Sequence, residues 1–474
     1  MELERTSDYV WTVPRSGGMR VTGVVFASES LMVKAREDRA VDQVANVAHL
    51  PGIVGASYAM PDIHWGYGFP IGGVAATDDD NGGVISPGGV GFDICCGVRL
   101  LSSHLTAADF AKHAYRIMAE LDTRIPRGAG KGGIALRDLL DGVLEHGARA
   151  ALDAGYGTER DLDRCEERGT SAGGRPDLVS PEARQRGGGQ LGSLGAGNHF
   201  LEVQVVDRIF DAGAAEAFGL RPGTLTVMIH CGSRGLGHQT CQDQLKLMGP
   251  AMARHGITVP DRQLACVPTV SREGQTYLGA MATAANFAWA NRHILAHETR
   301  EAFSAALRAA PADLGLDLIF DVAHNLAKLE IHLVDGQPRN LCVHRKGATR
   351  AFGPGHADLP DDLRGVGQPV LVPGSMGTAS WVLRGVADNP AFASAAHGAG
   401  RLMSRSAAKR RASGRDVRKD LETAGIAIRP GSVRLLAEEA PYAYKDVDEV
   451  ARVCEAAGLA ARVARLRPIG VVKG

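Results

Sequence analysis

A carboxylate and a thiol stand three residues apart in the glycine-rich segment GVGFDICCGVR, residues 89–99, as Asp93 and Cys96. A thiolate combined with a hard carboxylate is typical of a site for a borderline metal ion, and such a site needs imidazoles to complete it. Three histidines follow where apolar segments meet loops, namely His199 in GNHFLEV, His230 in IHCGSRG and His324 in FDVAHNLAK. A thiolate shared by two cations fits a two-metal site for phosphoryl transfer. We therefore expect these side chains to bind metal.

Three further segments combine glycine with hydroxyl or basic side chains. They are GSRGLGH at 232–238, HRKGATR at 344–350 and PGSMGTAS at 373–380. Loops of this kind form anion-binding nests and supply charge-assisted hydrogen bonds, so we expect a substrate with several phosphates. The chain has neither the GxxxxGK[ST] pattern of P-loop NTPases nor the KxDG pattern of lysine-adenylating ligases.

His397 in HGAGR is the candidate nucleophile, because it stands among small residues with no apolar pattern around it. A neutral imidazole can attack a metal-polarised α-phosphate and form a phosphoramidate, which divides one difficult transfer into two easier ones. A structural histidine is the alternative reading. Residues 401–420 follow directly and hold eight basic and two acidic residues. That segment is either a solvated helix face or a strip that binds a polyanion.

Strands must carry the candidate residues to one place. Apolar, β-prone segments at 225–229 and 316–322 end just before His230 and His324, and a third at 370–372 leads into PGSMGTAS. Ligands at strand ends are held by a rigid sheet. Apolar spacing predicts helices at 39–49, 107–122, 135–154 and 284–309.

Two stretches show no such spacing. Residues 60–76 are rich in Gly and Pro, which predicts a packed loop leading into a strand, where Asp62 and His64 either support the site or belong to a structural turn. Residues 157–189 are polar, charged and glycine-rich, which predicts a surface excursion. Candidate ligands lie on both sides of that excursion. We therefore expect residues 1–474 to form a single large α+β domain, with a mixed β-sheet core flanked by helices.

The composition narrows the class of protein. Among 474 residues, 53 are Lys or Arg and 53 are Asp or Glu, so the net charge of zero excludes a generally basic nucleic-acid-binding surface but allows a local patch. Eight cysteines follow no disulfide framework, and the chain starts without an apolar signal segment, so we expect a cytoplasmic protein with reduced thiols. No run approaches the roughly 20 apolar residues that a membrane-spanning helix needs.

Blocks from about Trp11 to Gly474 resemble the signature blocks of the RtcB family of GTP-dependent RNA-splicing ligases. They are GVGFDICCGVR, GNHFLEVQ, IHCGSRGLGHQ, FDVAHNLAK, VHRKGATR, PGSMGTAS, HGAGR and PIGVVKG. The resemblance implies an RtcB-like fold and a manganese enzyme that joins an RNA 3′-phosphate or 2′,3′-cyclic phosphate end to a 5′-hydroxyl end, in tRNA splicing or RNA repair. It also implies GTP as cosubstrate, with guanylyl-histidine and RNA(3′)pp(5′)G intermediates.

The same resemblance assigns roles to residues. It implies guanylylation of His397 and two manganese ions, with Cys96 shared, on Asp93, Cys96, His199, His230 and His324. Around the guanosine nucleotide it places Asn198, Phe200, Glu202, Asn325, Ser375, Ser380, Ala399, Tyr444 and Lys473, of which Glu202 and Lys473 would read the base. Against RNA phosphates it places Arg186, Arg234, Lys346, Arg401 and Arg405.

Two positions depart from the family pattern. The family usually has Asn at the position of Cys95 and Thr at that of Cys231, so extra thiols stand beside ligands and metal preference or oxidation sensitivity could differ.

Geometry raises a separate point. In a straight strand Phe200 and Glu202 share a face and His199 points away. We therefore expect the strand to begin after His199, or the two sites to lie on either side of it.

Two other functions fit the residues less well. One is a manganese-dependent phosphodiesterase or cyclic-phosphate hydrolase, which would not need a guanylylated His397. The other is a non-enzymatic RNA-end binding protein, but the ligand count leaves open positions on two metals, unlike a closed structural site. We expect a monomer without a membrane partner, and an archease-like activator is a candidate partner.

Overall fold

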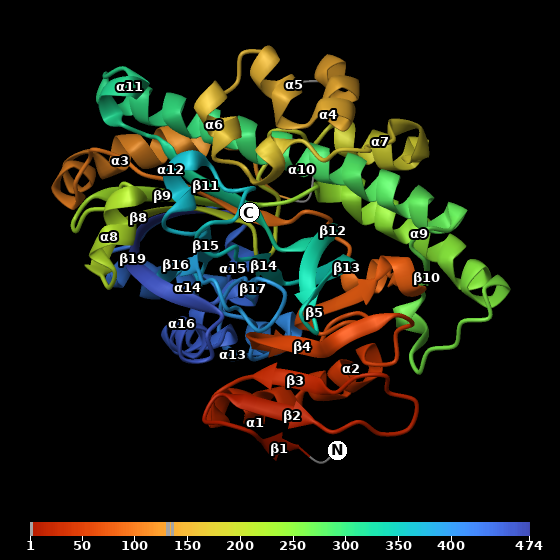
Figure 1. Cartoon of the computed structure of the whole chain (residues 1–474). Coiled ribbons are helices and arrows are strands. Elements are labelled where there is room, and N and C mark those ends of the chain that lie inside the picture. Colours follow the sequence, from red (N-terminus) through yellow and green to blue (C-terminus); the bar gives the residue numbers. More distant parts are fainter. Residues whose placement is uncertain (1–2, 129–132, 134–136) are drawn as a thin grey trace.

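The structure is a computed structural model and describes residues 3–128, 133 and 137–474 (Figure 1). The N-terminal strands belong to a seven-stranded sheet in the order β1-β2-β3-β4-β5-β13-β12. Its strands are β1 (Glu4–Arg5), β2 (Val10–Val13), β3 (Gly23–Phe26), β4 (Ile53–His64), β5 (Ile71–Asp78), β13 (Gln337–Lys346) and β12 (Asn325–Val334). Neighbours in it are antiparallel except β3 and β4, which are parallel, so the sheet is mixed.

An eight-stranded sheet contains most of the strands that end in candidate site residues. Its order is β11-β7-β9-β8-β19-β16-β15, with β18 added in parallel to β19. Its strands are β11 (Leu318–Ala323), β7 (Gly97–Leu101), β9 (Leu225–Cys231), β8 (Phe200–Ile209), β19 (Ala460–Lys473), β16 (Ser380–Gly385), β15 (Pro369–Val372) and β18 (Ala427–Pro430). Two short pairs complete the strands, β6 (Val84–Ile85) with β10 (Val267–Pro268) and β14 (Ala348–Arg350) with β17 (Ser394–Ala396).

Burial on both faces explains why the site-bearing strands were visible as continuous apolar segments. All seven residues of β9 are buried, and so are all six of β11. A strand covered on both sides has no polar face, so its sequence does not alternate. The strands predicted at 225–229, 316–322 and 370–372 are confirmed as β9, β11 and β15.

Helices flank the sheets, and Figure 1 shows α13, α14 and α16 on the side away from α10. The helices are α1 (Glu29–Glu37), α2 (Ala40–Val47), α3 (Ala107–Arg124), α4 (Leu140–His146), α5 (Ala148–Asp153), α6 (Glu159–Asp163), α7 (Pro181–Gly188), α8 (Ala212–Ala217), α9 (Arg234–Arg254), α10 (Arg272–Leu307), α11 (Pro311–Leu314), α12 (Asp361–Arg364), α13 (Arg405–Arg411), α14 (Gly414–Thr423), α15 (Val433–Leu436) and α16 (Val447–Ala456). The mixed sheets with flanking helices confirm the α+β class. No described helix is both long and apolar enough to cross a membrane.

The 36-residue helix α10 is the longest element and crosses the molecule above the sheets in Figure 1. It begins at Ser271, whose hydroxyl accepts a hydrogen bond from the Gly274 amide at 3.1 Å. Alanines along it let other elements approach closely, so most of its length is buried. The helix predicted at 284–309 is confirmed but starts earlier, at Arg272, because small residues there hide the apolar spacing.

The other predicted helices are mostly confirmed. α2 and α3 match the predictions at 39–49 and 107–122. The helix predicted at 135–154 is divided into α4 and α5 at Gly147, whose φ of 58° lies in the left-handed region and interrupts the helix. Residues 135 and 136, its predicted start, lie outside the described residues.

The two stretches without apolar spacing contain more regular structure than predicted. The prediction that a loop starts at residue 60 was wrong. Strand β4 continues to His64 before the chain turns into β5. Pro61 fits within β4 because the pairing with β5 is irregular between Ala59 and His64. Residues 157–189 contain α6 and α7, and Asp161 pairs with Arg300 of α10 at 2.6 Å. A single domain over residues 1–474 stays a prediction.

Candidate active site

The register of three neighbouring strands brings candidate ligands together. β7 lies between β11 and β9 and is antiparallel to both, and its first residue, Gly97, pairs with Ala323 and with Cys231. The residue before β7 therefore meets the ends of the other two strands. Cys96 directly precedes β7, His230 is the next-to-last residue of β9, and His324 directly follows β11.

The donor atoms of the five predicted ligands face one another. The Cys96 sulfur lies 3.3 Å from His230 Nε2 and 3.4 Å from His199 Nε2. His230 Nε2 is 3.3 Å from His324 Nε2, and His199 Nε2 is 2.9 Å from the Asp93 carboxylate. These atoms form two groups whose members lie within 4.8 Å of one another, Cys96–His230–His324 and Asp93–Cys96–His199. Cys96 belongs to both groups.

This donor set fits divalent metal ions. A sulfur, three imidazole nitrogens and a carboxylate are ligands that transition metals accept. Two imidazole nitrogens that face each other, as in His230 and His324, can share only one proton, whereas a cation among the donors would satisfy both lone pairs. The sulfur common to both groups is placed to be shared between two cations.

Burial controls the protonation of the cluster. Desolvation lowers the pKa of His230 and of His324 well below the usual range, which keeps both imidazoles neutral, as metal binding requires. Burial, together with the Asp93 charge, raises the pKa of Cys96 to about 12. For Asp93, burial acts against ionisation, but the hydrogen bond and charge of His199 outweigh it and bring the pKa to about 2. A bound cation would favour the Cys96 thiolate in turn.

His199 lies in the loop before β8, which begins at Phe200. The prediction that the strand starts after His199 is confirmed, so the alternation of β8 does not govern this imidazole. The loop also requires glycine at 195, where φ is +95° and an added Cβ would lie 2.7 Å from His199 Nδ1. Glycine therefore allows His199 to reach the cluster.

His397 follows β17 and is held by Asp62 of β4. Its Nδ1–H donates to Asp62 Oδ2 at 2.6 Å, and the same oxygen accepts from the backbone amides of His397 and Gly398. This bond fixes the tautomer and leaves Nε2 as the free nitrogen. The His397 ring packs edge-on against His324, with centroids 4.7 Å apart. A histidine with a free Nε2 therefore stands directly beside the metal-type cluster.

A cavity of about 260 Å³ opens at His397. Of the predicted nucleotide-binding residues, those that line it are Asn198, Phe200, Ser375, Ala399, Tyr444 and Lys473. The remaining ones, Glu202, Asn325 and Ser380, are not among its lining residues. Asn325 donates to the Asp93 carbonyl at 3.1 Å, while Gln204 bridges Glu202 and Ser380 at 2.9 and 3.0 Å.

Two charged groups, Lys473 in the cavity lining and Glu202 outside it, are strongly desolvated. Burial raises the pKa of Glu202 to about 8, against the opposing effects of Gln204 and Lys473. Burial lowers the pKa of Lys473, against Glu439 and Glu202. The Lys473 ammonium lies 5.7 Å from the Phe200 ring centre, within cation–π range. A carboxyl group that is protonated at neutral pH can donate as well as accept hydrogen bonds, which suits recognition of a purine edge.

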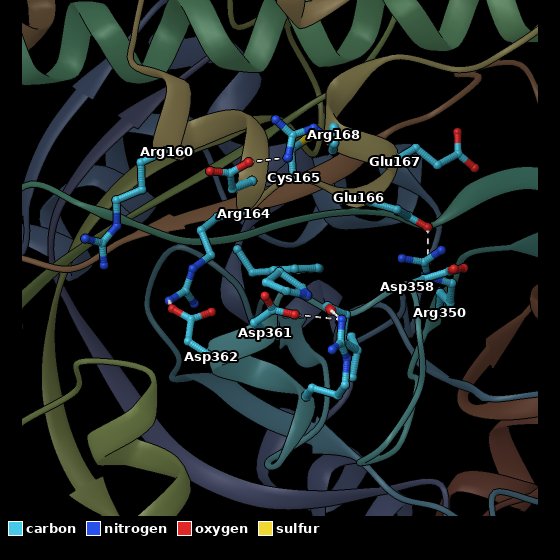
Figure 2. A pocket seen from close by; sticks show the side chains of 15 residues that line it. Arg160, Arg164, Cys165, Glu166, Glu167, Arg168, Arg350, Asp358, Asp361 and Asp362 are labelled. Atoms are coloured by element: carbon cyan, nitrogen blue, oxygen red, sulfur yellow. Dashed lines mark hydrogen bonds and ion pairs between the residues drawn. The ribbon is translucent and has the colours of Figure 1, made fainter.

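A larger cavity, of about 910 Å³, lies elsewhere, and Figure 2 shows its lining. Four of its five arginines face carboxylates, in the pairs Arg164–Asp362, Arg168–Asp163, Arg350–Glu166 and Arg364–Asp361. Because these charges largely cancel, the cavity offers little net attraction for a phosphate. It also contains none of the candidate metal ligands.

The model of the family described as tRNA-splicing ligase RtcB matches residues 43–474. The chain belongs to the RtcB family. It is 54% identical over 478 residues to the tRNA-splicing ligase RtcB of Archaeoglobus fulgidus, covering 100% of this chain and 99% of the relative. The RNA-splicing ligase RtcB of Mycobacterium bovis is 58% identical over 436 residues, 91% of this chain and 100% of the relative. The tRNA-splicing ligase RtcB of Thermococcus kodakarensis is 52% identical over 477 residues, 100% of this chain and 99% of the relative.

The predicted RNA-contacting residues of this RtcB chain differ in their surroundings. Arg186 is bound to Gln239 at 2.6 Å, and Arg234 donates to Ser193 and to the Gly128 carbonyl. Lys346 is buried and donates to the carbonyls of Tyr67 and Phe69, so its ammonium does not face solvent. Arg401 and Arg405 both reach Glu439 at 3.3 Å. Part of the basic segment is therefore neutralised.

The two thiols that depart from the RtcB pattern lie differently: Cys231 is close enough to the candidate ligand His199 to raise the pKa of that imidazole, against the effect of burial, whereas Cys95 packs against α10. Cys95 has a left-handed φ of 56°, and its sulfur lies 3.9 Å from Arg292 of α10. The Cys231 sulfur lies 3.1 Å from Asn291 Nδ2, also on α10. Both side chains are fully buried against the helix behind the site.

Sequence reasoning missed two groups that hold other residues of the RtcB site in place. Glu439 accepts from Tyr444 and from Arg401, and Arg292 donates to three segments that bear ligands. Neither residue lies in a block that suggested chemistry. The available signal was Arg292 between the apolar stretches 287–290 and 294–296, because a buried charge requires partners.

Proposed function

We propose that this chain is a GTP-dependent RNA ligase that joins RNA 3′-phosphate or 2′,3′-cyclic phosphate ends to 5′-hydroxyl ends, in tRNA splicing or RNA repair. Membership of the RtcB family supports a ligase, and the relatives of this chain are named as splicing ligases. The observation that carries the proposal is the position of His397. Its Nε2 borders a cavity whose lining includes six of the nine predicted nucleotide-binding residues and the candidate ligand His230.

The metal-binding residues would be divided between two ions. Asp93, Cys96 and His199 would hold one Mn²⁺, and Cys96, His230 and His324 the other. When bound, these ions supply Lewis-acid stabilisation of phosphate charge. The side-chain amide of Asn325, which donates to the Asp93 carbonyl and accepts from the Gly347 amide, would hold the loop that carries Asp93 in place.

In the first step His397 Nε2 attacks the α-phosphorus of GTP. The new N–P bond replaces the bond to the β-phosphate oxygen, and pyrophosphate leaves. The Asp62 carboxylate stabilises the positive charge that develops on the ring, because it accepts the Nδ1 proton at 2.6 Å. The product is guanylyl-His397.

In the second step an RNA 3′-phosphate oxygen attacks the phosphorus of guanylyl-His397, which frees the histidine and forms RNA(3′)pp(5′)G. A 2′,3′-cyclic end first takes up water and opens to a 3′-phosphate. The 5′-hydroxyl oxygen of the second RNA then attacks the RNA 3′-phosphorus. GMP leaves, and a 3′–5′ phosphodiester remains.

Other residues would bind the two substrates. Around the guanosine nucleotide we place Asn198, Phe200, Glu202, Asn325, Ser375, Ser380, Ala399, Tyr444 and Lys473, with Glu202 and Lys473 at the base. Arg186, Arg234, Arg401 and Arg405 are the residues we place against RNA phosphates without reading sequence. We further propose a cytoplasmic monomer, with an archease-like protein as the activator to test.

The test of this proposal is transfer of label from α-³²P-GTP to the protein with Mn²⁺, for the wild type and His397→Ala. We expect acid-labile, alkali-stable label on the wild type and none on the variant, because the phosphoramidate forms on that imidazole. Circular dichroism of both proteins controls for folding. An unlabelled wild type that binds Mn²⁺ would contradict the guanylylation step and favour a manganese-dependent phosphodiesterase.

A further inference from the structure

Arg292 carries a permanent charge in the interior of the molecule. It lies on α10 and is 0% exposed. A buried guanidinium is costly unless hydrogen bonds and an opposite charge compensate it. Its partners therefore show what the charge is used for.

All of the main partners of Arg292 stand close to candidate metal ligands in the sequence. Its Nη1 donates to the carbonyl of Cys95 at 2.8 Å and to that of Cys231 at 2.9 Å. Its Nη2 lies 2.9 Å from the Asp321 carboxylate, which is also fully buried. Cys95 directly precedes Cys96, Cys231 directly follows His230, and Asp321 lies three residues before His324.

One guanidinium thus joins the loop before β7, the end of β9 and strand β11. These are the segments that carry Asp93 with Cys96, His230 and His324. The planar fork of Arg offers several N–H groups at fixed angles, whereas Lys has a single flexible ammonium. The space is also tight, since a Cβ added at Gly97 would lie 3.0 Å from Arg292 Cζ.

Asp321 is fixed in turn by a second buried arginine. Arg99 of β7 donates to Asp321 Oδ2 at 2.7 Å, and Asp321 accepts from Arg292 as well. Arg99 also contacts His293, the neighbour of Arg292 on α10. The Asp321 carboxylate of β11, itself held by Arg99 of β7, therefore fixes Arg292 in one orientation.

We propose that Arg292, oriented by Asp321, is a positioning residue that sets the spacing of the metal ligands carried by β9 and by the segments next to β7 and β11. The proposal rests on the metal site of the proposed function. It predicts that replacing the Arg292 guanidinium changes the metal affinity more than the stability of the fold. The ligands would remain present but would no longer converge.

Arg300 provides a matched control on the same helix. It is also a buried arginine with a buried carboxylate, pairing with Asp161 at 2.6 Å and donating to the Leu316 carbonyl at 2.7 Å. None of these partners carries a candidate ligand or lies beside one. Arg300→Lys therefore disturbs a similar ion pair without touching the site.

The experiment measures binding of Mn²⁺ alone to the full chain by calorimetry, for wild type, Arg292→Lys and Arg300→Lys, with thermal unfolding of each metal-free protein. We expect Arg292→Lys to bind Mn²⁺ about 10- to 100-fold more weakly, as for other groups that orient metal ligands. Arg300→Lys should match the wild type in affinity despite a comparable loss of thermal stability. Co²⁺ titration adds a signature, since the thiolate-to-cobalt absorption should change only in Arg292→Lys.

Each result has a distinct meaning. Equal Mn²⁺ affinity in wild type and Arg292→Lys would overturn the positioning role, as would an equal loss of affinity in Arg300→Lys. A wild type that binds no Mn²⁺ would instead contradict the proposed function. If Arg292→Lys does not fold, Asp321→Asn carries the same test, since it keeps the side-chain volume and removes the charge that orients Arg292.

Discussion

At the scale of single residues, the Asp62–His397 pair decides whether the candidate nucleophile can act. Asp62 is fully buried, and one of its oxygens accepts three N–H groups from His397 and Gly398. The ring is therefore held in the tautomer with hydrogen on Nδ1, which directs the lone pair of Nε2 outward. Lys445 supports this arrangement by donating to the carbonyls of Pro61 and Ile63, on either side of Asp62.

Replacing Asp62 by Asn should slow the guanylylation of His397. The amide keeps the shape of the side chain but can donate to Nδ1, which favours the tautomer with hydrogen on Nε2 and removes the charge that stabilises the imidazolium. We expect the rate of label transfer from α-³²P-GTP to fall on the order of 10²- to 10⁴-fold. Single-turnover labelling at saturating GTP measures the change, and a rate within twofold of wild type would contradict the assigned role.

At the scale of elements, the basic segment after His397 is divided into two parts. Arg401, Arg405 and Lys409 all contact Glu438 or Glu439, so the part nearest the cavity is largely neutralised. Further along, on α13 and α14, Arg410, Arg415 and Lys419 are exposed. Within the part of the chain that the structure describes, no salt bridge engages these three side chains. Their charge is available to a polyanion.

Changing these three side chains together should weaken RNA binding without altering guanylylation. We expect Arg410→Gln, Arg415→Gln and Lys419→Gln combined to reduce the salt dependence of binding by up to about two counterions, since each single-strand phosphate contact contributes about 0.7 to the slope. Fluorescence anisotropy of a labelled RNA at several salt concentrations measures the slope. The control replaces Lys112 and Arg116, exposed residues of α3, by Gln. Equal slopes in both variants would exclude α13 and α14 from the RNA path.

At the scale of the whole molecule, the site joins distant parts of the chain. Asp62 comes from the seven-stranded sheet and His230 and Lys473 come from strands β9 and β19 of the eight-stranded sheet, while Cys96 lies in the loop before β7. A cation bound among such ligands binds the folded state and not the unfolded chain. Metal binding should therefore stabilise the entire fold by linkage.

Removing metal should lower the stability of the whole chain in one transition. Treatment with a chelator should reduce the free energy of unfolding by about 2.7 kcal/mol per site relative to protein in Mn²⁺ at 100 times the dissociation constant. Thermal unfolding with and without Mn²⁺ measures the shift. Cys96→Ser serves as the comparison, because the shift should shrink when the shared thiolate is lost. Identical unfolding curves for wild type with and without Mn²⁺ would contradict a metal site at this cluster.

The sequence by itself determined the chemical types and their local settings. Asp93 and Cys96 within glycines, and His230 and His324 after apolar runs, were visible because a strand buried on both faces leaves a continuous apolar signal. Side-chain alternation left two possibilities at His199, and the structure confirms the one in which β8 starts after that residue. The basic segment was also evident from composition, but its neutralisation by Glu438 and Glu439 was not.

Only the tertiary structure decided which of these groups touch. Asp62 and His397 are separated by 335 residues, and Arg292 reaches Cys95 across 197. Contacts over such distances depend on strand order and register, which local patterns do not encode. The pairing of Gly97 with both Cys231 and Ala323 is what brings three ligands to one point. Residue types therefore indicated the chemistry, whereas sheet register determined the geometry that would perform it.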